Sequence, residues 1–148
     1  MPDVYTDIMA SPFHLAFPVA DLDSTRVFYL DVLGCTAGRS GPDWIDIDFF
    51  GSQIVAHVSE AGSLPTLDSN VIDGHEVPLP HFGAVLSMEA WRVMASKLRE
   101  ADVDFVIEPH VRYEGMFKEQ ASLLLRDPSG NALEFKAFAD PSRLFATD

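Results

Sequence analysis

The stretch DPSGNALEFKAF, residues 127–138, joins a chain reversal to a strand. Proline after aspartate and glycine near the end of the turn suit a tight reversal. The run 132–138 that follows is largely apolar, which predicts a strand packed in the interior. Glu134 interrupts this run between Leu133 and Phe135. A buried carboxylate without a partner is costly, so we expect Glu134 to be paired, hydrogen-bonded or bound to a metal ion.

The residues that precede this stretch predict one compact unit. Short apolar runs at 81–88, 103–108 and 121–126 are typical of strands. Residues 89–101 carry apolar side chains at helical spacing, which predicts an amphipathic helix. The order is therefore strand, helix and then strands, ending in 132–138.

The first half of the chain repeats this order. A strand is expected at 13–19, a helix at 21–33, and a hairpin of strands at 44–50 and 53–58. The two halves therefore form an internal repeat. The repeat is approximate: aligning Gly51 with Gly130 puts Val55, and not His57, opposite Glu134.

Residues 60–80 separate the halves and are rich in glycine, proline, aspartate and asparagine. They show little periodicity and predict a long loop, which is uncommon unless functional or mobile. We expect a single domain over residues 1–148, with module one at about 12–59, the loop at 60–80 and module two at about 81–138.

Composition excludes several kinds of partner. The chain has 148 residues, 47% of them hydrophobic, and a net charge of −13, which argues against nucleic acid or an anionic membrane surface. No run approaches the roughly 20 apolar residues of a membrane span, and the acidic N-terminus does not resemble a signal peptide. The single cysteine, Cys35, permits no intrachain disulfide. This suits a reducing compartment, and we expect a cytoplasmic protein.

Three polar residues lie in strands that otherwise bury apolar side chains: His14, His81 and Glu134. Two imidazoles and a carboxylate form a facial triad, which holds a divalent metal ion and leaves coordination positions open. Each residue also has an ordinary interpretation, because a histidine at a strand start is often structural and Glu134 can face solvent. Their joint placement across the repeat makes a metal site as good an interpretation of these residues as a structural one.

The motifs FHLAFPVADLDSTRVFYLDVLGC (13–35), HFGAVLSM (81–88) and DPSGNALEFKAF (127–138) resemble the vicinal oxygen chelate superfamily. This superfamily includes glyoxalase I, extradiol dioxygenases, bleomycin- and fosfomycin-resistance proteins and methylmalonyl-CoA epimerase. The resemblance covers about residues 12–138 and is closest to the predicted extradiol-type dioxygenase branch. It implies an α+β fold of two tandem βαβββ modules that form a curled mixed sheet around a metal cavity. It also implies that His14, His81 and Glu134 are the ligands.

The resemblance implies a metal-dependent dioxygenase, with Fe²⁺ or Mn²⁺, acting on a catechol-like or other vicinal-oxygen small molecule. One alternative is a glyoxalase- or epimerase-type lyase or isomerase that uses Zn²⁺, Ni²⁺ or Co²⁺ to stabilise an enediolate. Another is a resistance protein that sequesters its ligand. Relatives of this size commonly pair, so a homodimer is expected.

The residues around the metal are less determined by the sequence. A fourth ligand, where the family has one, comes from the last strand of module one, with His57 and Ala56 as the candidates. Three ligands favour the oxygenase and four favour the lyase. We predict catalytic roles as acid–base or hydrogen-bonding groups for His57, His110 and Tyr113. His75, in the expected loop, is either solvated or part of a lid.

Overall fold

The structure is a computed structural model, and it describes residues 11–72 and 74–148. Module one begins with β1 (His14–Val19), followed by α2 (Leu22–Arg26), which continues without a break into a π-helical segment (Val27–Val32). Its remaining strands are β2 (Thr36–Ser40), β3 (Trp44–Phe49) and β4 (Ser52–Val58). The helix starts where expected, because the Asp21 carboxylate accepts a hydrogen bond from the Ser24 amide at 2.9 Å. It is followed by Gly34 in the left-handed region, with φ +80°.

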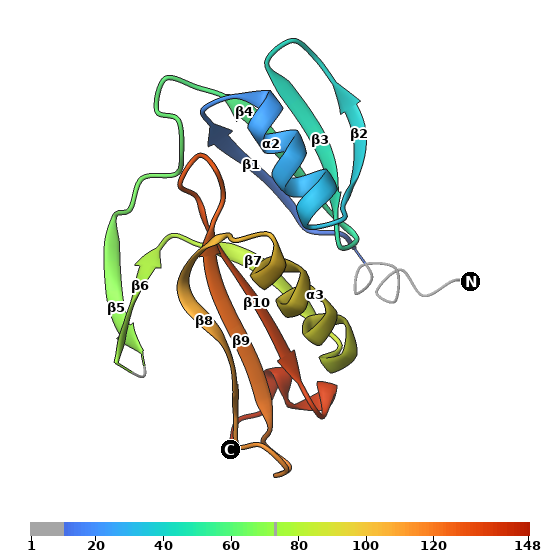
Figure 1. Cartoon of the computed structure of the whole chain (residues 1–148), viewed down its shortest axis with the longest axis vertical. Helices are drawn as coiled ribbons and strands as arrows, with labels where there is room; N and C mark the ends of the chain where they lie inside the picture. The colour runs from blue at the N-terminus through green and yellow to red at the C-terminus, as the bar shows by residue number, and fades with distance from the viewer. Residues whose placement is uncertain (1–10, 73) are drawn as a thin grey trace, which may run out of the picture.

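Module two has the same sequence of elements: β7 (Phe82–Leu86), α3 (Met88–Glu100), β8 (Asp104–Arg112), β9 (Gln120–Arg126) and β10 (Ala132–Phe138). The strand orders are β1-β4-β3-β2 and β7-β10-β9-β8. In each sheet the strand that comes first in the chain pairs in parallel with the strand that comes last, and the other neighbouring strands pair antiparallel. The predicted α+β fold with two tandem βαβββ modules is confirmed, and Figure 1 shows the modules one above the other.

The strand registers relate the two modules residue by residue. His14 lies beside Gln53 in the parallel pair of module one. Phe82 lies beside Leu133 in module two, so one step back His81 falls level with Ala132. Val55 lies two residues beyond Gln53 in module one, and Glu134 lies two residues beyond Ala132 in module two. Val55 therefore occupies the place that corresponds to Glu134.

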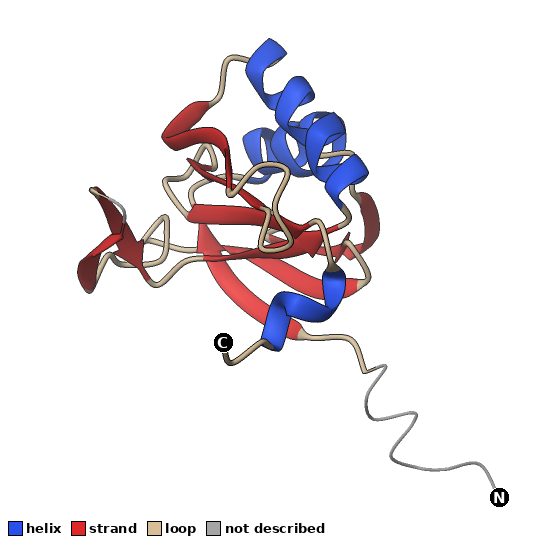
Figure 2. Ribbon diagram, turned by 90° about the horizontal axis from the view of Figure 1, so that it is seen from below, coloured by secondary structure: helices blue, strands red, loops and turns tan. Residues whose placement is uncertain are grey.

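The predicted loop at 60–80 was wrong over half of its length. It contains β5 (Asp68–Ile72) and β6 (His75–Leu79), an antiparallel hairpin in which Ile72 lies beside His75. The hairpin projects to one side in Figures 1 and 2, and β5 is exposed along its whole length, so its residues show no apolar alternation. The signal that could have revealed it is the pair Asp73-Gly74, which favours a two-residue hairpin turn.

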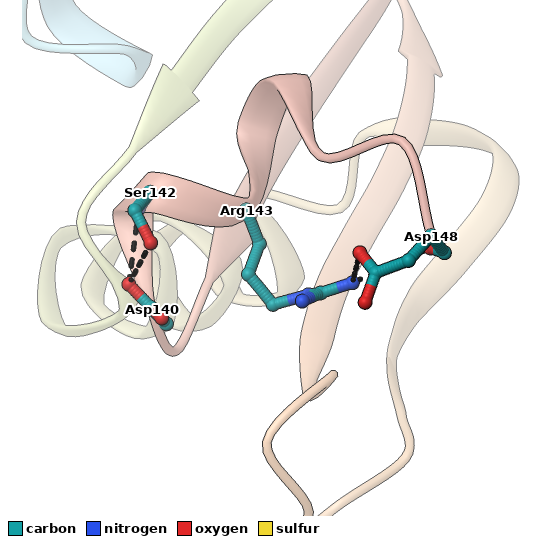
Figure 3. Close-up of polar contacts among 4 residues, drawn as sticks. All are labelled: Asp140, Ser142, Arg143 and Asp148. Carbon is teal, nitrogen blue, oxygen red and sulfur yellow. Dashed lines mark hydrogen bonds and ion pairs between the residues drawn. The ribbon is translucent and has the colours of Figure 1, made fainter.

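Strand β2 was also not predicted, because TAGRS is exposed throughout and shows no apolar alternation. The strand expected at 103–108 extends to Arg112. After β10 the chain forms a short 3₁₀ helix (Pro141–Phe145). Asp140 caps this helix by accepting hydrogen bonds from the amide and hydroxyl groups of Ser142 (3.0 and 2.7 Å), and Arg143 pairs with Asp148 at 3.0 Å (Figure 3).

The core lies between the helices and one face of each sheet. Figure 2 shows α2 and α3 gathered on one side of the strands. Phenylalanine rings join the modules: Phe17 and Phe82 lie 5.1 Å apart between centroids, and Phe49 and Phe135 lie 5.9 Å apart. Successive side chains of a strand point to opposite faces. The alternate residues of each strand therefore point away from this core and form what we call the outer face of each sheet. Glu134 lies on the outer face of module two.

The turn that opens the DPSGN stretch fastens module two to module one. Asp127 is 5% exposed and accepts a hydrogen bond from the hydroxyl of Tyr29 at 2.9 Å. The Asn131 amide donates to the carbonyl of Pro18 at 3.0 Å, and the Ser129 hydroxyl accepts from a backbone amide of module one at 2.9 Å. The stretch therefore does more than reverse the chain. No helix among the described residues combines the length and apolar character needed to cross a membrane.

Candidate functional site

Two of the three predicted ligands meet on the outer face of module two. His81 stands just before β7 and Glu134 lies in β10, and the His81 Nε2 and Glu134 Oε2 atoms are 3.0 Å apart. Both side chains are mostly enclosed, at 21% and 23% exposed. Strand β10 approaches β7 closely here, because Gly83 lies beside Glu134 and a Cβ on Gly83 would collide with the Glu134 carbonyl oxygen.

Neighbouring groups hold both side chains in place. The Ser122 hydroxyl donates to Glu134 Oε1 at 3.0 Å, so each carboxylate oxygen has a partner. The Nδ1 atom of His81 lies 2.7 Å from the carbonyl oxygen of Pro78. A carbonyl only accepts hydrogen bonds, so Nδ1 carries the proton and Nε2 is the atom left to face Glu134.

The pair is electrostatically coupled. The hydrogen bond to Glu134 raises the pKa of His81 above its ordinary value, against the opposing effect of burial. Burial alone raises the pKa of Glu134, but hydrogen bonds from His81 and Ser122, together with the charge of Lys136, lower it overall. In a neutral His81 the Nε2 lone pair would face the carboxylate oxygen. Two electron pairs in this position repel each other, and a proton or a metal ion between the two atoms removes the repulsion.

The donor set fits a divalent metal ion. A metal-binding histidine usually donates its second ring N–H to a carbonyl or carboxylate, which is the arrangement of His81 and Pro78. Within the described residues, however, no three His, Cys, Asp or Glu side chains lie close enough to hold a metal ion. One chain therefore brings His81 and Glu134 together and does not bring His14 to them.

His14 lies at the start of β1, on the outer face of module one. Its Nδ1 is 2.9 Å from the side-chain oxygen of Gln53, its neighbour in β4. This oxygen also only accepts, so Nε2 is again the ring atom left to bind a metal. His14 is thus oriented like His81, but in the other sheet.

The His81–Glu134 pair lines a cavity of about 210 Å³. Its walls come from β8, β9, β10 and the β5–β6 hairpin. The lining residues are Ile72, His75, Val77, His81, Ile107, His110, Arg112, Gln120, Ala121, Ser122, Leu124, Glu134 and Lys136. Larger hollows elsewhere are more open and hold neither His81 nor Glu134.

The structure places the other predicted site residues in different parts of the fold. His110 lines the cavity, whereas His57 is exposed on β4 beside Trp44 in the other sheet. Tyr113 is 45% exposed, lies outside the lining and stacks under the Arg112 guanidinium at 5.2 Å.

Sequence reasoning missed four polar lining residues: Arg112, Gln120, Ser122 and Lys136. Ser122 and Lys136 have a sequence signal once Glu134 is chosen. Lys136 lies two positions along the same strand, and Ser122 lies on the preceding strand of the predicted hairpin. His75, expected in a loop, belongs to β6 and lines the cavity.

Comparison with known proteins assigns the chain to a family. The family described as the Glyoxalase/Bleomycin resistance protein/Dioxygenase superfamily matches residues 11–135. Among solved structures, a glyoxalase/bleomycin resistance protein/dioxygenase from Alicyclobacillus acidocaldarius is 32% identical, with a TM-score of 0.72 and coverage of 91% of this chain and 96% of that one. A virulence protein from Salmonella typhimurium is 25% identical, with a TM-score of 0.59 and coverage of 86% and 96%.

The fosfomycin resistance protein FosX from Listeria monocytogenes shares the fold at 15% identity, with a TM-score of 0.66 and coverage of 90% of this chain and 98% of that one. No curated protein sequence matches the chain. The family match and the 32% identical structure together span nearly all of the described residues. This chain belongs to the glyoxalase/bleomycin resistance protein/dioxygenase superfamily, whose fold is that of the vicinal oxygen chelate proteins.

Proposed function

We propose that this protein is a metal-dependent dioxygenase that acts on a catechol-like or other vicinal-oxygen small molecule, with His14, His81 and Glu134 as ligands. One observation carries the proposal. His81 Nε2 and Glu134 Oε2 lie 3.0 Å apart at a cavity, while a carbonyl holds the other nitrogen of the histidine. This is the donor chemistry of a histidine–carboxylate metal site.

The position of Val55 supports a set of three ligands. It corresponds to Glu134 by strand register, and valine cannot bind a metal. His57 lies two residues beyond Val55, corresponds instead to Lys136, and is exposed. A facial triad leaves more positions for substrate and oxygen than a four-ligand site does, which favours the oxygenase over the lyase.

The residues of the cavity have separate tasks in this proposal. A bound ion would act as a Lewis acid toward two adjacent substrate oxygens. His110, with its Nδ1 3.1 Å from the Glu108 carbonyl, would take a hydroxyl proton at Nε2. Ser122 keeps Glu134 oriented, and the apolar side chains of Ile107 and Leu124 limit the access of water.

We place His14 in the site of a second copy of the chain. His14 and the His81–Glu134 pair lie on outer faces of different sheets, and both faces point away from the core that joins the modules. A symmetric dimer that sets module one of one copy against module two of the other would complete two equivalent sites. The expected homodimer and the predicted ligand set then have one explanation.

Metal analysis and oxygen uptake test the proposed activity. Protein purified without chelator should hold about one metal ion per chain and consume oxygen with a catechol panel. Glu134→Ala should lower both metal affinity and activity at least about 10–100-fold, because loss of even a supporting residue costs that much. Glu89→Ala removes an exposed carboxylate from α3 and should change neither. A folded Glu134→Ala protein with full metal content would refute the site.

Mixing two inactive variants tests the shared site. In a dimer of His14→Ala with Glu134→Ala, one site keeps every ligand and the other loses both residues. Random mixing should therefore restore about a quarter of wild-type activity in a symmetric dimer. No restoration, in a mixture shown to contain mixed dimers, would mean that His14 does not serve the other copy. Turnover of a vicinal-oxygen substrate without oxygen uptake would favour the lyase.

A further inference from the structure

The lining of the cavity beside His81 and Glu134 is much less acidic than the chain as a whole. The chain carries 23 acidic residues against 10 lysines and arginines. Among the described residues that line the cavity, Glu134 is the single acid, while Lys136, Arg112 and three histidines bring basic groups. In a strongly acidic protein, a cavity with few acids and a lysine in its lining is the place where an anion meets the least repulsion.

Lys136 is the best placed of these groups. It lies two residues beyond Glu134 on β10, so both side chains share the outer face, about 7 Å apart along the strand. In the cross-strand direction Lys136 lies beside Ser122, which in turn lies beside His110. Arg112 follows in the next row of β8.

The Lys136 amine forms no ion pair among the described residues, although its positive charge contributes to the lowered pKa of Glu134. The ion pairs there are Arg39–Asp46, His81–Glu134 and Arg143–Asp148. Glu134 is the nearest candidate, but its two oxygens already accept from His81 and Ser122. The amine lies instead 5.8 Å from the centre of the Phe138 ring. A half-buried ammonium group next to a cavity is suited to binding an anionic group there.

We propose that the cavity binds a vicinal-oxygen molecule that carries a carboxylate, with this carboxylate at Lys136. This inference rests on the proposed function, because it takes the vicinal oxygens to lie at His81 and Glu134. The spacing of about 7 Å between the two residue positions along β10 is comparable to the length of a hydroxybenzoate unit, measured from its hydroxyl oxygen to a carboxylate oxygen in the para position. An aromatic diol with a carboxylate para to one hydroxyl therefore spans the two positions.

Three probes separate the two parts of this proposal. Catechol presents the diol alone, benzoate presents the carboxylate alone, and 3,4-dihydroxybenzoate presents both. Binding to the metal-containing protein is measured by calorimetry at neutral pH and low salt, for the wild type, Lys136→Met, Lys136→Arg and Lys97→Met. Lys97 is an exposed lysine of α3, so its substitution removes the same charge away from the cavity.

We expect the wild type to bind 3,4-dihydroxybenzoate about tenfold more tightly than catechol, as one charge-assisted hydrogen bond allows. Lys136→Met should abolish this preference and weaken benzoate binding, while catechol binding stays unchanged. Lys136→Arg should retain most of the preference, and Lys97→Met all of it. Circular dichroism shows whether each variant is folded.

Equal affinity for catechol and 3,4-dihydroxybenzoate in the wild type would overturn the carboxylate site and leave the proposed function standing. A preference that persists in folded Lys136→Met would also overturn it. Benzoate binding that depends on Lys136, in a protein that binds no catechol, would support the anion site and refute the diol activity. No binding of any probe would refute both.

Discussion

Tyr29→Phe tests the connection between the modules, because it removes one hydrogen-bonding group and leaves the ring in place. Tyr29 is completely buried, and its hydroxyl donates to Asp127 Oδ2 at 2.9 Å. Burial, with a smaller effect from Asp127, holds the pKa of Tyr29 well above its ordinary value, so the hydroxyl remains a donor at any working pH. The substitution therefore deletes one charge-assisted hydrogen bond between module one and module two.

The structure sets the size of the effect. Hydrogen bonds to charged groups contribute about 1.5–3 kcal/mol to stability. Asp127 Oδ2 keeps a second donor, the Asn131 side chain at 3.0 Å, and Oδ1 keeps the amides of Ser129 and Asn131. The carboxylate is therefore not left without partners, and we expect a loss of about 2 kcal/mol in the free energy of unfolding. For a chain of this length that corresponds to a fall of about 4–8 °C in Tm.

Urea unfolding at neutral pH measures this loss, with Tyr113→Phe as the matched control. Tyr113 is 45% exposed, so the same atom is removed from a surface position and the expected change is within about 0.5 kcal/mol. A Tyr29→Phe protein as stable as the control would show that the hydrogen bond to Asp127 contributes nothing to the joining of the modules.

Three further outcomes follow from the structure. Gly83→Ala should destabilise the protein by about 1–3 kcal/mol or more, measured by urea unfolding, because its Cβ collides with the backbone at Glu134. In metal-free protein the charged His81–Glu134 pair should stabilise the fold most between pH 4.5 and 6.5. Because the pKa of His81 is raised in the folded state, its contribution to stability is lost as the pH rises. Because the pKa of Glu134 is lowered in the folded state, its contribution is lost as the pH falls. A flat stability difference from Glu134→Gln across pH 4–9 would contradict this. Cys35, whose pKa burial raises to about 12, should resist a disulfide reagent at pH 8 until urea unfolds the chain.

The repeat could be predicted from the sequence because the strands and the helix of each module show their hydrophobic periodicity within short continuous segments. The apolar strands and the stripe of α3 were found from their alternation and helical spacing. The elements missed were β2 and the β5–β6 hairpin, which bury little. A strand that gains its stability from backbone pairing and not from an apolar face leaves no hydrophobic pattern to detect.

The sequence singled out His81 and Glu134, which the structure brings together, but it did not show how the two side chains meet. Glu134 was recognised as an exception within an apolar strand, and His81 as the start of the second repeat. Their separation of 3.0 Å depends on the close approach of β7 to β10, which a glycine permits. A periodicity identifies the face on which a side chain lies, but it does not determine which two faces meet.

The same limit explains why His14 does not touch Glu134, although His81, its counterpart in the repeat, does. The repeat gives each module a first-strand histidine, His14 or His81, and a facing position on its last strand, Val55 or Glu134. Only module two has both groups, so module one can contribute one ligand at most to any shared site. Their outer faces point away from the common core, and the hydrogen bonds of the Asp127 turn hold the modules in that orientation. Within one chain, the contacts that stabilise the fold therefore keep His14, the proposed third ligand, from His81 and Glu134, and in the proposed dimer a second copy would supply it without breaking those contacts.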